Sequence, residues 1–106
     1  MARDKKAKEK KEILKISKDL VIAASEKAAV HVDQVHSVKN IKADIVDNKT
    51  EIDIFITVNF GCKIPDVAFN VQNAVKTAVE SNTEIKVDKV NIHIQGVKII
   101  KDGKNG

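Results

Sequence analysis

One stretch, residues 51–82, most constrains the fold, because a strand pattern is followed almost at once by a helix pattern. Alternating apolar residues place one set of side chains on a single strand face: Ile52, Ile54, Ile56, Val58 and Phe60. Gly61 ends the alternation, and Pro65 suits a first helical turn because its φ is fixed and it has no N–H. Helical spacing then relates Val67, Val71, Ala74, Val75 and Ala78. Neither surface can be buried alone, so we expect the two to share one core.

Two further strands flank this unit. Residues 41–45 alternate apolar and charged side chains, and the turn 47–50 (Asp-Asn-Lys-Thr) connects them to the central strand, which predicts a hairpin. A last strand is expected over about 89–100, where Val90, Ile92 and Ile94 alternate with polar residues until Gly96.

A first helix is predicted from about Lys18 to Val30, with Ser17 as its N-cap. Ile16 before the cap and Val21 in the helix have the spacing of a hydrophobic staple. The expected inner face of this helix consists of Leu20, Val21, Ala24 and Ala28.

The resulting order, α-β-β-α-β, predicts an α+β fold: a two-layer sandwich in which two helices cover one face of a three-stranded sheet. The strand at 52–60 is the longest, which favours sheet order 1-2-3 with this strand in the centre. A fully antiparallel sheet in order 2-1-3 stays open.

The charge of the chain is concentrated at its beginning. Residues 1–18 hold eight Lys/Arg and three Asp/Glu, a net charge of +5, although the whole chain carries only +4. We therefore expect a basic, disordered tail over 1–15, a folded domain over 16–100 and a polar tail over 101–106. Residues 1–12 also fit a helical extension, or an electrostatic contact with an anionic membrane or RNA.

Catalytic, metal and cofactor sites are not indicated. The single cysteine, Cys62, cannot form an internal disulfide, which fits a cytoplasmic setting. Cys62 and His93 are the one nucleophile–base candidate, but they fall in different elements and nothing else supports the pairing. His31, His36 and His93 lack the spacing of metal ligands. No apolar run approaches the ~20 residues of a membrane span.

The polar face of the predicted sheet is the candidate interaction surface. It carries Phe55, Thr57, Asn59, Asn91, His93 and Gln95. Phe69 is a second candidate, because helical spacing places it opposite the apolar stripe of its helix. Solvent-facing positions of a sheet show the same alternation without any function, so both interpretations stay open.

Residues 58–80 and 87–99 together resemble the alkaline shock protein family, which includes related general stress proteins. The matching residues are Phe60, Gly61, Ile64, Pro65, Val67, Ala68, Asn70, Val71, Gln72, Val90, Asn91, Ile92, His93, Ile94, Gln95, Gly96 and Val97. Among these, Gly61, Pro65 and Gly96 are expected to serve the structure. The chain departs from the family pattern at three places: Gln34-Val35 replaces a Gly-Val pair, Cys62 replaces an apolar residue and Phe69 replaces a charged one.

The resemblance implies a non-enzymatic scaffold or regulatory domain in cell-envelope or stress homeostasis, with a link to lipid synthesis in some members. It also implies a protein partner or self-association, with peripheral membrane association through a partner. The basic tail is a second route to the membrane, and the expected setting is the cytoplasm. RNA or ribosome binding is the alternative. The chain, however, lacks a Gly-x-x-Gly loop and has only Phe55 as a sheet aromatic, so a base-stacking platform is incomplete.

Overall fold

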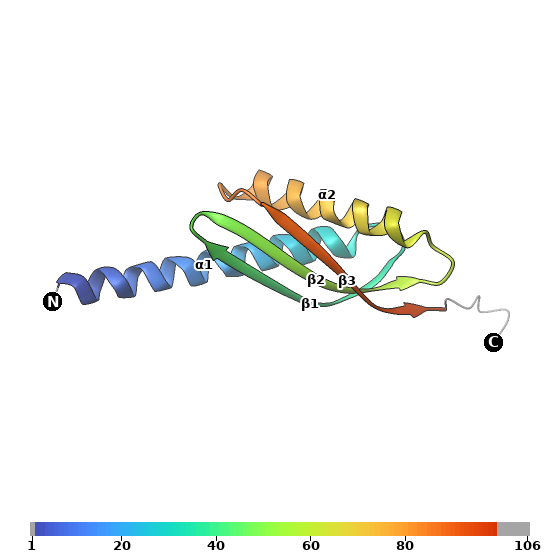
Figure 1. Cartoon of the computed structure of the whole chain (residues 1–106), viewed down its shortest axis with the longest axis horizontal. Helices are drawn as coiled ribbons and strands as arrows, with labels where there is room; N and C mark the ends of the chain where they lie inside the picture. The colour runs from blue at the N-terminus through green and yellow to red at the C-terminus, as the bar shows by residue number, and fades with distance from the viewer. Residues whose placement is uncertain (1, 100–106) are drawn as a thin grey trace.

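A computed structural model gives the fold, with the backbone described for residues 2–99 and the side chains for residues 15–99. Five elements follow in the order α1 (Ala2–Val30), β1 (Val35–Val46), β2 (Lys49–Asn59), α2 (Ile64–Asn82) and β3 (Lys89–Lys98). This order and the two-layer α+β architecture confirm the predicted fold class. Figure 1 shows both helices running along one face of the sheet. The predicted tail over 101–106 and the end of the predicted last strand at Ile100 lie outside the described residues.

The sheet has the order β1-β2-β3, which confirms the favoured topology and rules out the order 2-1-3. β1 and β2 are antiparallel and form the predicted hairpin, whereas β2 and β3 are parallel and are joined through α2. The hairpin loop has two residues with positive φ, Asp47 (51°) and Asn48 (64°). Asp and Asn tolerate this left-handed region, so the tight turn forms without the more common Asn-Gly pair.

The core lies between the sheet and the two helices. From β2 the buried side chains are those of Ile52, Ile54, Ile56 and Val58, all at 0% exposure. From α2 they are those of Val67, Val71, Val75 and Val79. The predicted helix stripe was therefore right at three of its five positions, because Ala74 and Ala78 are only partly buried and Val79 was missed. Phe60 was predicted to be buried, but it is 71% exposed because it lies beyond the end of β2.

Helix α1 is longer than predicted. It begins at Ala2, so Ser17 lies inside the helix and is not its N-cap. Residues 2–15 were expected to form a disordered tail, but they continue the same helix. The alternative for residues 1–12, a helical extension, describes this segment better. Ala, Lys and Glu are strong helix formers and dominate this segment, which gives a physical reason for the extension. Ile16, no longer before a cap, is 59% exposed and forms no staple with the buried Val21.

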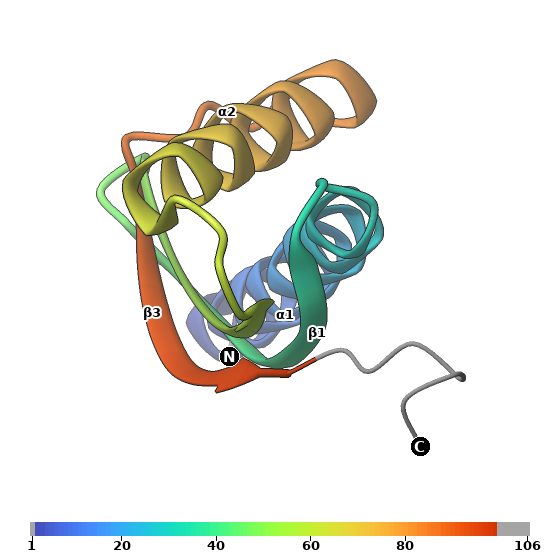
Figure 2. The same cartoon turned by 90° about the vertical axis from the view of Figure 1, so that its right-hand side faces the viewer.

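The inner face of α1 is also rotated from the predicted one. Val21, Ser25 and Ala29 are fully buried, Ala24 and Ala28 are partly buried, and Leu20 is 52% exposed. The buried residues are small, so α1 can approach both α2 and β1 closely. In the view of Figure 2, the sheet curves around the two helices and leaves its other face open.

Candidate functional site

The outer sheet face, which is the face turned away from α1 and α2, is the candidate functional site. Alternation along β2 brings Asp53, Phe55, Thr57 and Asn59 to this face, because their neighbours in the strand are buried in the core. The parallel register then places Asn91 beside Asp53 and His93 beside Phe55. Two strands that are separated by a whole helix in the sequence thus contribute paired side chains to one surface.

The centre of this face is an aromatic pair. The rings of Phe55 and His93 are stacked, with their centroids 4.4 Å apart and their planes inclined by 13°. The ammonium group of Lys42, on β1, lies 5.6 Å from the centroid of the Phe55 ring, which is within reach of a cation–π contact. The stacked pair therefore joins all three strands at mid-sheet.

Hydrogen bonds hold the histidine of this pair in place. The Nε2 of His93 donates to Oδ1 of Asp53 over 2.9 Å, and the side-chain amide of Asn91 donates to the same oxygen over 3.2 Å. The Asn91 amide also donates to Oε2 of Glu51 over 2.8 Å.

The pKa of Asp53 is lowered, and the hydrogen bond from His93 is the largest cause. Partial burial opposes this shift, whereas Asn91 and Lys42 add to it. Asp53 is therefore held as a carboxylate that orients the ring. We define Lys42, Asp53, Phe55, Asn91 and His93 as the Phe55 cluster.

Two of the remaining predicted site residues form hydrogen bonds toward β1. The hydroxyl oxygens of Thr57 and Ser37 are 2.6 Å apart, and the Asn59 amide donates to Oε1 of Gln34 over 3.2 Å. Asn59 also donates its backbone N–H to the Gln34 carbonyl oxygen over 2.9 Å. Gln34 has a φ of 71°, a left-handed conformation in which glycine is unstrained. Glycine, which the resembled family pattern has at this position, would adopt this conformation without strain.

Gln95, the last predicted residue of the sheet face, is separated from the Phe55 cluster by a bulge. The register of β2 and β3 shifts between Ile56 and Thr57, so Gly96 rather than Gln95 pairs with Thr57. Gln95 is exposed beside this bulge. Phe69 is 61% exposed on α2, in the helical layer, so it does not belong to the same surface as the sheet residues.

The family-motif residues expected to serve the structure occupy the positions where the backbone turns or bends. Gly61 has a φ of 90° in the connection between β2 and α2. Pro65 stands in the first turn of α2. Gln72, from the same motif, donates its side-chain amide to the carbonyl oxygen of Val90 over 2.9 Å and so ties α2 to β3.

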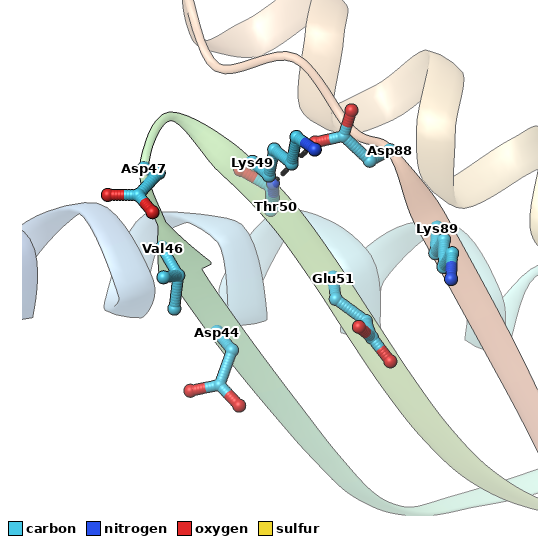
Figure 3. Close-up of a pocket in the computed structure, with 8 residues that line it drawn as sticks. All are labelled: Asp44, Val46, Asp47, Lys49, Thr50, Glu51, Asp88 and Lys89. Carbon is cyan, nitrogen blue, oxygen red and sulfur yellow. Dashed lines mark hydrogen bonds between the residues drawn. The ribbon is translucent and has the colours of Figure 1, made fainter.

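A hollow of about 550 Å³ lies at the hairpin end of the sheet (Figure 3). Asp88, at this hollow, is held by two hydrogen bonds: its carboxylate accepts the backbone N–H of Thr50 over 2.7 Å, and its own N–H donates to the Thr50 carbonyl oxygen over 2.8 Å. This exchange fastens the start of β3 to the start of β2. The other charged side chains at the hollow carry both signs of charge and are exposed: Asp44, Asp47, Lys49, Glu51 and Lys89. We assign the hollow a structural role.

The structure places the two residues of the nucleophile–base candidate, Cys62 and His93, in different surroundings. His93 bonds to Asp53 on the outer face, whereas Cys62 is a partly buried residue packed against the core. Within residues 15–99, no three His, Cys, Asp or Glu side chains gather in a way that could hold a metal ion. None of the described helical residues provides an apolar stretch that could cross a membrane.

The sequence analysis placed Phe55, Asn91 and His93 on one face of the sheet, but it did not select Asp53 or Lys42 as members of the site. The alternation of residues 52–60 indicated the face. The pairing of Phe55 with His93 depends on the register between two distant strands, and no local signal encodes that register.

Comparison with known proteins identifies the relatives of this chain. The model of the alkaline shock protein 23 family, described as having a cell envelope-related function, matches residues 6–99. The uncharacterized protein Spy1535 of Streptococcus pyogenes is 31% identical, over 73% of this chain and 72% of its own length. The uncharacterized protein YqhY of Bacillus subtilis is 34% identical over 61% of this chain, and the chain spans about half (48%) of its length.

Solved structures support the fold alone. Two variants of MamM CTD match with TM-scores of 0.55 and 0.54 at 20% and 19% identity. They cover 74% and 78% of this chain and 95% and 96% of their own chains. The sequence motif, the fold and the family match over residues 6–99 agree, and this chain belongs to the alkaline shock protein 23 family, whose function is cell envelope-related.

Proposed function

We propose that this chain is a non-enzymatic scaffold domain that binds a protein partner, or a second copy of itself, through the outer sheet face. Its setting is cell-envelope or stress homeostasis, in the cytoplasm and with peripheral association to the membrane. This scaffold role extends to the support of lipid synthesis. The single observation that carries it is the stacked Phe55–His93 pair on the sheet face that both helices leave open.

Preorganisation of this pair favours binding. Asp53 fixes the orientation of the His93 ring, and Phe55 stacks on it, so little side-chain freedom remains to be lost when a partner docks. Rigid aromatic surfaces of this kind commonly dominate the free energy of protein interfaces. The surrounding amides and hydroxyls of Thr57, Asn59 and Gln95 provide the polar rim that such an interface needs.

The charges of the sheet face argue against RNA as its ligand. The charges beside the aromatic pair are mixed, since the carboxylates of Asp53 and Glu51 stand with the ammonium of Lys42, so this face lacks the excess of positive charge that binds a phosphate backbone. The stack also offers one phenylalanine rather than the two or three aromatics of a base-stacking sheet. RNA contact would therefore fall to the basic residues 1–18, where it would be non-specific and strongly salt-dependent.

Crosslinking in cells tests the proposal. The tagged full chain, Phe55→Asp and Val46→Asp are each recovered from crosslinked cells, and their partners are identified by mass spectrometry. Val46 is the matched control because it is 63% exposed at the hairpin, away from the cluster. We expect Phe55→Asp to lose the protein partner or self-association, and Val46→Asp to keep it, with circular dichroism spectra unchanged for both.

Equal recovery of partners by Phe55→Asp and wild type contradicts the proposal. Deletion of residues 1–12 distinguishes partner binding by the sheet face from RNA binding by the basic segment. Recovery of mainly RNA and ribosomal proteins, lost with this deletion and with added salt, would favour nucleic-acid binding through the basic segment.

A further inference from the structure

Helix α1 carries a second apolar stripe in addition to its buried face. Ile16, Leu20, Ala23, Lys27 and Val30 follow each other at spacings of four, three, four and three residues. This is the a/d spacing of a heptad repeat, which forms the seam of a coiled coil. In the sequence the same spacing reaches back to Ile13. We call these five residues the α1 seam.

The α1 seam is exposed along its whole length. Ile16 is 59% exposed, Leu20 52% and Val30 47%, and Ala23 and Lys27 are exposed too. The residues that pack on the sheet and on α2 form a separate stripe of Val21, Ser25 and Ala29. One helix therefore presents two apolar stripes, and its own domain buries only one of them.

Charges beside the seam indicate what can occupy it. Asp19 and Glu26 are seven residues apart, so both lie at the g position on one flank, and both are exposed. The opposite flank is formed by the neutral Ser17 and Ala24. A partner helix with basic residues along the acidic flank, and an acidic residue facing Lys27, would complement this pattern.

Pairing with a second copy is disfavoured in either direction. In a parallel pair of α1 helices, Lys27 would face Lys27 of the other copy within the seam. In an antiparallel pair the g flanks adjoin, so the row of Asp19 and Glu26 would face its own counterpart. Like charges at these positions oppose association.

An anionic membrane is also a poor match for the seam. Residues 16–30 hold two lysines, Lys18 and Lys27, and two acidic residues, Asp19 and Glu26, so their net charge is zero. Helices that lie on membranes are instead rich in Lys and Arg along their polar face. A basic segment does precede the seam, over residues 1–15, and the deletion of residues 1–12 in the experiment below separates its effect.

We propose that the α1 seam docks one α-helix of a different protein, in a two-helix coiled-coil contact with basic residues against Asp19 and Glu26 and an acidic residue against Lys27. This surface lies in the helical layer, apart from the Phe55 cluster on the outer sheet face. The domain would then hold two partners at once, one on each layer.

A synthetic helix tests the seam directly. The probe is a fluorescent 21-residue peptide, of about three heptads, with Ile and Leu at a and d, Lys at e and g, and one Glu at the a position that faces Lys27. Its charge-reversed twin carries Glu at e and g and Lys at that a position. Binding to the full chain is followed by fluorescence anisotropy, with Leu20→Asp as the seam variant and with Val46→Asp and Phe55→Asp as controls.

We expect saturable binding of the probe, weakened by roughly tenfold or more in Leu20→Asp, because an apolar seam position would become charged. The twin should bind roughly tenfold more weakly than the probe, since favourable flank pairs become repulsive. Both control variants should bind like wild type. Loss of binding in Phe55→Asp would move the helix site to the sheet face, so the two proposals can fail separately.

Three further results would overturn the proposal. The first is equal binding of the probe and its twin, or of wild type and Leu20→Asp. The second is a wild-type dimer in light scattering that Leu20→Asp converts to a monomer, which would make the seam a self-association surface. The third is sedimentation with phosphatidylglycerol vesicles that Leu20→Asp abolishes while deletion of residues 1–12 does not, which would assign the seam to the membrane.

Discussion

The imidazole ring of His93 lies almost flat on the phenyl ring of Phe55, although 37 positions of sequence and the whole of α2 separate the two residues. The contact exists because β3 returns parallel to β2 in the register that sets His93 beside Phe55. Asp53, two residues before Phe55, fixes the ring from its edge. The candidate surface is thus a product of strand register.

The stability of the fold should fall in acid partly through Asp53. The pKa of Asp53 is lowered in the folded state, chiefly by the hydrogen bond from His93. A carboxyl group with a lowered folded-state pKa stabilises the fold above its unfolded pKa of about 3.9. This contribution is lost as the pH falls through the lower folded-state pKa. Urea unfolding between pH 7 and pH 2.5 should therefore show a smaller loss of stability for Asp53→Asn than for wild type. Parallel curves would contradict this role of Asp53.

Two substitutions at Gln34 should separate backbone strain from the side-chain bond. Gln34→Ala and Gln34→Gly both remove the bond to the Asn59 amide, but only glycine relieves the left-handed φ of 71°. We expect the glycine variant to exceed the alanine variant in free energy of unfolding by about 1 kcal/mol. Thermal and urea unfolding of the pair measure the difference, and equal stabilities would show that the strain is absent.

Replacement of Ser25 by alanine should stabilise the fold. The Ser25 hydroxyl is fully buried and has no hydrogen-bond partner among the described residues. Because Ser25→Ala removes an unsatisfied polar group and improves helix propensity, we expect a gain of about 1 kcal/mol in urea unfolding.

Ser37→Ala is the contrasting control for Ser25→Ala. It removes a hydroxyl that lies 2.6 Å from that of Thr57, and it should lower the free energy of unfolding by about 0.5–1.5 kcal/mol. A loss of stability in Ser25→Ala would mean that its hydroxyl is hydrogen-bonded after all.

The two glycines of the family motif should differ in their tolerance of alanine. At Gly61 the φ of 90° is unfavourable for any side chain, so Gly61→Ala should cost about 1–2 kcal/mol although a Cβ meets no atom within 4 Å. At Gly96 a Cβ would lie 3.6 Å from Cγ2 of Thr57, an ordinary contact. Gly96→Ala should therefore unfold close to wild type, and a comparable loss in both variants would refute the distinction.

Much of the fold could be predicted from local pattern. The alternation of Ile52, Ile54 and Ile56 predicted a strand with one buried face, and Pro65 marked the start of α2. The prediction of Ser17 as a helix cap was wrong because Ser is also tolerated within helices and the residues before it favour helix. The prediction that Leu20 is buried was wrong because α1 has two apolar stripes, and the sequence alone does not say which one the domain buries.

Less of the candidate site could be predicted. Periodicity identified the face that holds Phe55 and Asn91, because a period of two assigns every strand residue to a side. It could not identify the partners of each residue, since the bulge near Gly96 and the parallel return of β3 are tertiary features. The pairing of Asp53 with His93 therefore became visible only in the structure.

The central position of β2 has a consequence for how the chain folds. On one side β2 pairs with β1 through a two-residue loop, a contact of short range that hairpins typically form within microseconds. On the other side it pairs with β3, which requires α2 to form and close a loop from Asn59 to Lys89. Non-local parallel pairing carries the larger entropic cost and forms later. Pulse-labelling hydrogen exchange should therefore protect the amides of the hairpin before those that bond across β2 and β3.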